Sequence, residues 1–216
     1  MNERVKKQRL PLQGIRVLEL SHIVAGPGAG MMLGDMGADV IKIEHPETGD
    51  TARSHDNAGG TFYTFNRNKQ FLALDLRHAK GKAIFEKLVA RADVVLDNFA
   101  PGALKRLGLD YAWGRSINQR VIYCSVKGFL PGPYSDRPFL DELAQMAGGL
   151  AYLTGLVNQP MRAGASITDI GAATYGVMGG SPHFTGVSKR ARVTISNPVC
   201  LKPSCSGSAS TLPPRK

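Results

Sequence analysis

The chain has 216 residues, of which 43% are hydrophobic and 20% are charged, and its formal net charge is +10. This composition is that of one folded globular domain and not of a disordered chain. No run approaches the ~18 apolar residues of a membrane span, and the first residues lack the apolar stretch of a secretory signal.

The positive charge lies at the two ends of the chain. Residues 1–10 hold four basic residues and one acidic residue, and residues 181–216 hold six basic residues and no acidic one. The body over 11–180 is nearly neutral, with 17 basic and 16 acidic residues. Basic ends without interleaved aromatic residues do not form a nucleic-acid-binding stripe, so we expect no nucleic-acid or membrane partner.

Strand-like and helical runs alternate along the body, which predicts a Rossmann-like α/β fold with a mostly parallel sheet and crossover helices. We expect strands over 15–20, 39–44, 71–76, 93–98 and 121–126, and helices over 31–37, 79–91, 101–107 and 140–148. Ligands of such sheets bind beyond the carboxyl ends of the strands, so the loops expected to carry function are 21–30, 45–50, 98–102 and 127–137.

After residue 180 the composition changes. Residues 181–216 are rich in Ser and Pro and show no periodicity beyond a short ARVTIS run. We therefore expect three parts: a basic arm over 1–10, the α/β body over 11–180, and an unrelated, disordered basic tail over 181–216.

A glycine-rich loop, AGPGAG over 25–30, is expected after the first strand. A dinucleotide fingerprint starting at Gly26 would need a glycine at position 31, which is Met31, and no phosphate-binding GK[ST] follows. The loop is therefore either a close backbone approach to a ligand or a plain tight turn.

The three cysteines form no disulfide or metal pattern. Cys200 and Cys205 lack the C-x2-C spacing of a zinc site, so no metal is expected, and Cys124 is expected to be a buried apolar residue of a strand. This usage suits a reducing compartment, and we expect a cytoplasmic protein.

Asp169 follows Thr168 at the start of a small-residue helical run. Spacing alone favours a helix N-cap for this pair. The alternative is a carboxylate that the amides of a helix N-terminus keep ionised and nucleophilic.

Six segments, found in the family's order over residues 11–179, resemble the family III CoA-transferases, also called the CaiB/BaiF family: PLQGIRVLEL, LGDMGADVIKIEHPETGD, NRNKQFLALDL, DNFAPGALKRLGL, YCSVKGF and ITDI. The resemblance implies that residues 11–180 form the N-terminal part of the family's large domain. It also implies transfer of CoA between carboxylic acids, with a CoA thioester as substrate and no permanently bound cofactor.

The resemblance assigns roles to individual residues. It makes Asp169 the nucleophile that attacks the thioester, with mixed-anhydride and aspartyl-CoA intermediates. The implied CoA-binding residues are Ile23, Val24, Ala25, His45, Asn98, Phe99, Ala103, Arg106 and Lys127. Core packing is the alternative for Ile23, Val24 and Phe99. His45 replaces an arginine that is common in the family and Gln70 a common Arg or Lys, and either change would weaken phosphate contacts.

The resemblance also bears on the reaction. The related racemases carry a histidine before an aspartate, whereas here Leu140 precedes Asp141, so the acid–base partner that racemisation needs is absent. The run over 127–155 most resembles the mesaconate branch. We therefore expect a small dicarboxylate, such as mesaconate or succinate, as a substrate.

The resemblance ends near Gly179, whereas the relatives continue with a small domain and form an interlocked homodimer. Two main hypotheses follow. The chain is a CoA-transferase polypeptide that uses Asp169, or it is a truncated, catalytically inactive remnant that at most binds CoA or a full-length partner. The remnant hypothesis predicts exposed apolar surface and poor solubility. The order of the motifs disfavours a third hypothesis, an unrelated α/β nucleotide binder.

Overall fold

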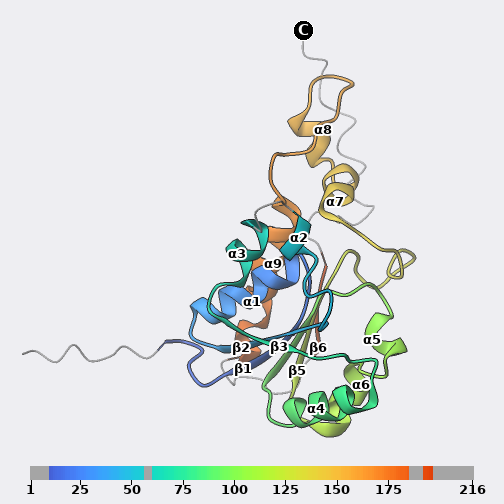
Figure 1. Cartoon of the computed structure of the whole chain (residues 1–216). Coiled ribbons are helices and arrows are strands. Elements are labelled where there is room, and N and C mark those ends of the chain that lie inside the picture. The colour runs from blue at the N-terminus through green and yellow to red at the C-terminus, as the bar shows by residue number, and fades with distance from the viewer. Residues whose placement is uncertain (1–9, 56–59, 185–191, 197–216) are drawn as a thin grey trace, which may run out of the picture.

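The structure, a computed structural model, describes residues 10–55, 60–184 and 192–196. Its centre is a six-stranded parallel sheet with the order β3-β2-β1-β4-β5-β6 (Figure 1). The strands are β1 (Arg16–Leu20), β2 (Asp39–Glu44), β3 (Lys69–Ala73), β4 (Val94–Asp97), β5 (Ile122–Lys127) and β6 (Arg192–Ser196). The Rossmann-like fold class expected from the sequence is confirmed.

The central strands are apolar because helices cover both faces of the sheet. All four residues of β4 are buried, and Leu18 of β1 lies in register with Ile41 of β2 and Val95 of β4. Successive side chains of a strand point to opposite faces of the sheet and pack into two separate cores, so that Val17 belongs to one core and Leu18 to the other. The molecule is therefore a three-layer α/β/α sandwich.

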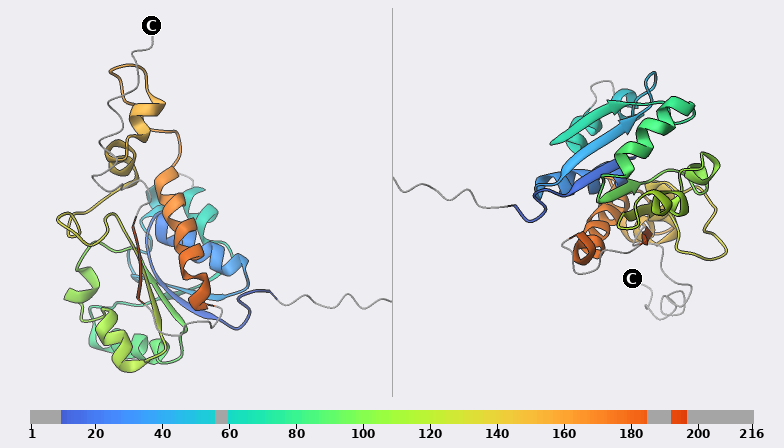
Figure 2. Two further views of the ribbon diagram at one scale, coloured as in Figure 1. Left: turned by 180° about the vertical axis from the view of Figure 1, so that it is seen from behind. Right: turned by 90° about the horizontal axis from the view of Figure 1, so that it is seen from below.

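Helices α1 (Ala25–Asp35) and α9 (Ile167–Phe184) cover one face of the sheet, whereas α4 (Ala79–Val89), α5 (Ala103–Arg106) and α6 (Tyr111–Ile117) cover the other (Figure 2). The short helices α2 (Ala52–His55) and α3 (Gly60–Asn66) lie beside α1. Helices α7 (Asp141–Ala147) and α8 (Leu150–Thr154) form a protrusion beyond the sheet. The sequence had indicated α4, α5 and α7 within a few residues, but not α2, α3, α6 or α8.

The glycine-rich segment over 25–30 is helical, so the prediction of a loop there is wrong. It forms the first two turns of α1, and Pro27 is tolerated because amides of the first turn have no partner within the helix. The glycines allow close packing on several sides. A Cβ atom on Gly28 would lie 3.2 Å from Ala173 of α9, and one on Gly30 would overlap the buried carboxylate of Glu19.

Strand β6 lies inside the segment that was expected to be a disordered tail. Arg192–Ser196 pairs in parallel with β5, with Cys124 in register with Val193. The expectation of disorder is therefore wrong for Arg192–Ser196, which extends the sheet. The remaining tail residues 185–191 and 197–216, with Cys200 and Cys205, and the arm over 1–9 lie outside the described residues.

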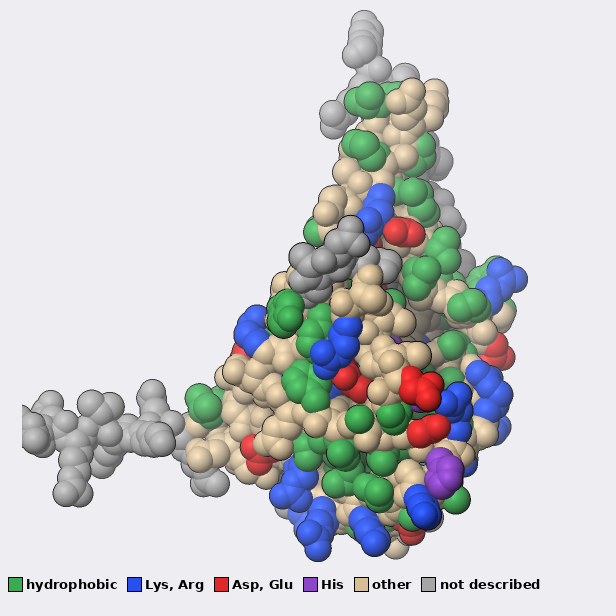
Figure 3. Space-filling model, viewed as in Figure 1, with side chains coloured by type: hydrophobic (Ala, Val, Ile, Leu, Met, Phe, Trp, Pro, Cys, Tyr) green, Lys and Arg blue, Asp and Glu red, His purple; other side chains and the backbone are tan. Residues whose placement is uncertain are grey.

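The protrusion exposes apolar side chains. Hydrophobic groups recur along α7, α8 and the loop that follows them (Figure 3). The most exposed residues there are Val157, at 86% of its surface, and Leu153, at 78%, and Tyr152 and Leu156 are almost as exposed. A patch of this kind is typical of a protein–protein contact or of a surface prone to aggregation.

Candidate functional site

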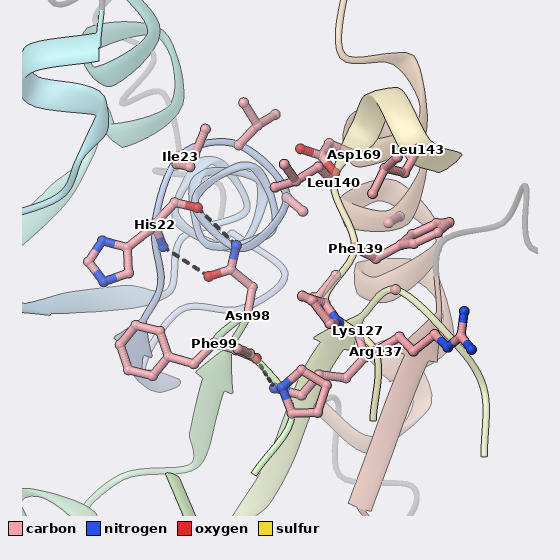
Figure 4. A pocket seen from close by; sticks show the side chains of 18 residues that line it. His22, Ile23, Asn98, Phe99, Lys127, Arg137, Phe139, Leu140, Leu143 and Asp169 are labelled. Carbon is pink, nitrogen blue, oxygen red and sulfur yellow. Dashed lines mark hydrogen bonds between the residues drawn. The ribbon is translucent and has the colours of Figure 1, made fainter. Parts of the chain in front are cut away.

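A cavity of about 470 Å³ opens at the carboxyl ends of β1, β4 and β5. This is the point where the strand order reverses between β1 and β4, the usual place for a ligand in a doubly wound sheet. Its lining includes Asp169 and six of the nine implied CoA-binding residues: Ile23, Val24, Ala25, Asn98, Phe99 and Lys127. The structure thus brings together residues that are distant in sequence (Figure 4).

Asn98 fixes the loop between β1 and α1. Its side chain accepts a hydrogen bond from the His22 amide and donates one to the His22 carbonyl, both at 2.9 Å (Figure 4). The next residue along the chain, Phe99, packs its ring against the His22 imidazole with 5.1 Å between centroids. Asn98 therefore acts on the cavity by holding backbone.

Lys127 comes from the end of β5 and is already paired within the chain. Its ammonium donates to the buried carboxylate of Asp97 and to the Phe99 carbonyl, the latter at 2.8 Å. The Ser125 hydroxyl donates to the other oxygen of Asp97. Lys127 thus ties β5 to β4 below the cavity and brings little unneutralised charge to it.

Asp169 lies in the first turn of α9, which begins at Ile167, so the predicted N-cap role for Thr168 and Asp169 is wrong. A residue from elsewhere in the chain takes that role. The buried Asp141 carboxylate, from the first turn of α7, accepts hydrogen bonds from the Thr168 amide at 2.9 Å, the Thr168 hydroxyl at 2.6 Å and the Asp169 amide at 3.3 Å.

This arrangement determines the charge state of Asp169. The Asp141 carboxylate, and not that of Asp169, receives the amides of the helix N-terminus, contrary to the expectation that these amides keep Asp169 ionised. Burial, with a further contribution from the negative charge of Asp141, raises the pKa of Asp169 to about 6, against the opposing charge of Arg162. A carboxylate with a raised pKa is a more basic nucleophile and is still ionised at neutral pH.

Several residues of the cavity were not among the predicted site residues. Phe139, Leu140 and Leu143 form the wall near Asp169 (Figure 4). Arg137 also lines the cavity, but its exposed guanidinium points away from Asp169 and lies over the Tyr134 ring, 4.9 Å from the ring centroid. The three wall residues precede or belong to α7, and the packing of α7 on α9 brings them close to Asp169. Arg137 was inside a loop expected to carry function, and its charge was the one signal that could have singled it out.

Three predicted CoA-binding residues do not line the cavity. Ala103 begins α5, directly after the lining segment, and Arg106 ends the same short helix. His45 follows β2, where its ring contacts the exposed Arg77 guanidinium and lies 3.8 Å from the Asp75 carboxylate. Arg77, which the sequence did not single out, thus adds a cation beside His45.

Cys124 is 3% exposed within β5, as expected for an apolar strand residue. Burial, and then the charge of Asp97, raises the pKa of its thiol to about 12. Within the described ranges, no cluster of three His, Cys, Asp or Glu side chains has the geometry of a metal site. Nor is any described helix long and apolar enough to cross a membrane.

The fold and the cavity define a class: an α/β protein with a ligand site at the topological switch point and a half-buried carboxylate of raised pKa in the first turn of a helix. Comparison with known proteins narrows this class. The profile of CoA-transferase family III matches residues 12–181, and the chain belongs to this family.

The relatives agree with this assignment. A succinate–glutarate CoA-transferase from Agrobacterium fabrum is 43% identical over 180 residues, which are 77% of this chain and 45% of that protein. The human succinyl-CoA:glutarate CoA-transferase is 39% identical, over 76% of this chain and 39% of that protein. A CAIB/BAIF family protein from Brucella suis superposes with a TM-score of 0.84 at 35% identity, covering 97% of this chain and 60% of that one. The chain spans about half the length of the curated relatives it matches.

Proposed function

We propose that this chain binds a CoA thioester in the cavity and transfers CoA between carboxylic acids through the Asp169 carboxylate. The observation that carries the proposal is the position of Asp169: half-buried, with a raised pKa, and facing the loops at the ends of β1 and β4. No other carboxylate lines the cavity among the described residues.

The cavity suits the two ends of a CoA thioester. Its wall beside Asp169 is apolar, which fits an acyl group and the pantetheine arm. Basic side chains lie within or around it, at Arg137 and Arg106, with His45 and Arg77 further along the same edge of the sheet. Lys127, which is paired with Asp97, adds little net charge to this set. Cations of this kind suit the phosphates of the nucleotide end. In this proposal Ile23, Val24 and Ala25 hold the ligand by backbone and apolar contact, and Asn98 and Phe99 hold those residues.

The chemistry requires the ionised form of Asp169. Its carboxylate oxygen bonds to the acyl carbon, the carbon–sulfur bond breaks, and CoA leaves as a thiolate, which gives a mixed anhydride. The thiolate then attacks the Asp169 carbonyl, releases the first acid and leaves an aspartyl-CoA thioester. An acceptor carboxylate reverses these two steps and departs as the new CoA thioester, so Asp169 is regenerated.

We propose a small dicarboxylic acid, such as succinate or mesaconate, as a substrate. Two relatives are named for succinate or succinyl-CoA with glutarate, while others are named for formyl-CoA with oxalate. A homodimer is proposed as the assembly, built on the apolar protrusion of α7 and α8.

The test separates binding from chemistry. Isothermal titration of the chain with CoA measures binding. Incubation with succinyl-CoA and hydroxylamine measures chemistry, because hydroxylamine converts an aspartyl anhydride or thioester into a stable hydroxamate that mass spectrometry locates. We expect CoA binding, and a hydroxamate on Asp169 that is lost in Asp169→Ala.

The control variant is Asp136→Ala, an exposed carboxylate of the loop before α7 that does not line the cavity. It should leave both readouts unchanged. CoA binding without hydroxamate would favour the inactive remnant over the transferase. Absence of CoA binding would contradict the proposed function altogether.

A further inference from the structure

Ile23, in the wall of the cavity, has an unusual backbone conformation. Its φ angle is 67°, in the left-handed region that is costly for a β-branched residue. The other described non-glycine residues with positive φ are Asn68 and Asn158, and asparagine tolerates this region. A strained residue persists only where its surroundings hold it, and such residues concentrate at ligand sites.

A buried carboxylate holds this conformation. Oδ1 of Asp50, in the loop after β2, accepts a hydrogen bond from the Ile23 amide at 3.0 Å and one from the Ala52 amide at 2.9 Å. The imidazole of His22 lies 3.7 Å from the same oxygen. Asn98, which follows β4, holds the His22 backbone, and Asp50, which follows β2, holds the Ile23 amide. The β1–α1 loop is therefore fixed at two successive residues by side chains from two different loops.

Asp50 is itself held by a buried lysine of β2. Its side chain is fully buried, and Oδ2 lies 2.9 Å from the ammonium of Lys42, which is also fully buried. Lys42 donates in addition to Glu19 at 2.9 Å, and Lys69 lies 2.8 Å from the second Glu19 oxygen. The cluster thus holds two cations and two carboxylates under α1 and is close to neutral.

The charge of Asp50 is secured by the same contacts. Burial would raise the pKa of this carboxyl, but its contact with His22 and the charge of Lys42, with the Ala52 and Ile23 amides, outweigh burial and hold the pKa well below its usual range. Asp50 does not line the cavity, so it acts on any ligand there through the lining residues that it contacts, Ile23 and His22.

We propose that Asp50 is a positioning residue for the CoA site: anchored by Lys42, it holds the Ile23 backbone in its left-handed conformation and so shapes the β1–α1 wall opposite Asp169. This inference rests on the proposed function in naming CoA as the ligand. Because the buried ion pair orders this strained wall before the ligand arrives, CoA binding does not lose free energy to ordering it.

A double-mutant cycle tests the proposal, with the dissociation constant for CoA and the melting temperature as readouts. We expect Asp50→Ala to weaken CoA binding about tenfold. Without the hydrogen bond from Asp50, the bound state must include the cost of placing a β-branched residue in the left-handed region, and that cost corresponds to about a tenfold ratio of dissociation constants. In the Ile23→Gly background the same change should weaken binding by less than about twofold, because glycine adopts positive φ freely. The melting temperature should fall in both backgrounds.

Two further variants separate positioning from stability. Asp50→Asn keeps an oxygen that accepts from the Ile23 amide, so CoA affinity should stay within about threefold while the melting temperature falls. Asn118→Ala removes two hydrogen bonds, to the Val89 and Ala92 carbonyls, far from Ile23 and the cavity, and it should lower the melting temperature with no effect on affinity. Equal losses of affinity from Asp50→Ala in the two backgrounds, or none in either, would overturn the proposal.

Hydrogen exchange of the parent protein tests the anchor when Asp50→Ala does not fold or when CoA does not bind. The Ile23 amide should exchange at least about a hundredfold more slowly than in an unfolded chain. Exchange at the unfolded rate would refute the anchor. A protected amide in a parent that does not bind CoA would instead refute only the proposed function and the naming of CoA as the ligand.

Discussion

Replacing Asp169 by asparagine should stabilise the protein at neutral pH. The pKa of this carboxyl is raised from its ordinary value of 3.8 to about 6, by burial and by Asp141, so its ionisation disfavours the folded state. A tenfold change in proton affinity corresponds to about 1.4 kcal/mol. The free energy of unfolding of Asp169→Asn should therefore exceed that of the parent by up to roughly 3 kcal/mol above pH 7.

Urea unfolding gives the measurement, followed by the fluorescence of Trp113, the single tryptophan, which stacks on Phe85 in the core. The gain should be absent below about pH 4, grow between pH 4 and 6 and stay constant above pH 7. Asp39→Asn, an exposed carboxylate at the start of β2, should change stability by less than about 0.5 kcal/mol. A gain that is the same at pH 3.5 and pH 7.5, or no gain at all, would refute the assignment of a buried, costly charge.

Three further predictions concern the cavity and the surface. Gly26→Ala should destabilise the fold by about 1–3 kcal/mol in urea unfolding, because the new Cβ would lie 2.5 Å from Ser21, whereas Gly164→Ala has open space and should be neutral. Arg137→Gln should weaken CoA binding about threefold to tenfold in titration at low salt, and a loss that does not shrink at high salt would contradict an electrostatic role. Leu153→Glu should reduce concentration-dependent association in sedimentation velocity, and unchanged association would exclude the protrusion as the contact surface.

The fold was largely predictable because the parallel sheet imposes its pattern on local sequence. Buried β-branched runs such as that of β4 indicate strands, and the alternation with helices fixes the class. The helix at 25–30 was not predictable, because its glycines serve packing partners, Ala173 and Glu19, that only the folded chain brings near. Local propensity there indicates a loop, and tertiary packing overrides it.

The site was predictable in its positions but not in its electrostatics. The rule that ligands lie beyond the carboxyl ends of strands selected four loops, of which 21–30, 98–102 and 127–137 contribute to the cavity lining and 45–50 does not. The family resemblance pointed to Asp169. The sequence did not indicate that Asp141 takes the amides of α9, because that contact joins residues 27 and 28 positions apart in the chain. The resemblance had marked Asp141 only as the neighbour of Leu140. The role of Asp50 was not predictable for the same reason, because its partner, the Ile23 amide, lies in the loop after β1 and Asp50 lies in the loop after β2.

The position of β6 in the sheet has a consequence for how the chain folds. β5 is buried along nearly its whole length, and one of its edges stays unpaired until Arg192–Ser196 has been synthesised and has paired with it. During that interval the nascent chain exposes an apolar strand edge, which is a template for pairing with other chains. Parallel strands joined over long connections also form slowly. Expression at lower temperature, which slows intermolecular pairing, should therefore improve the yield of folded protein.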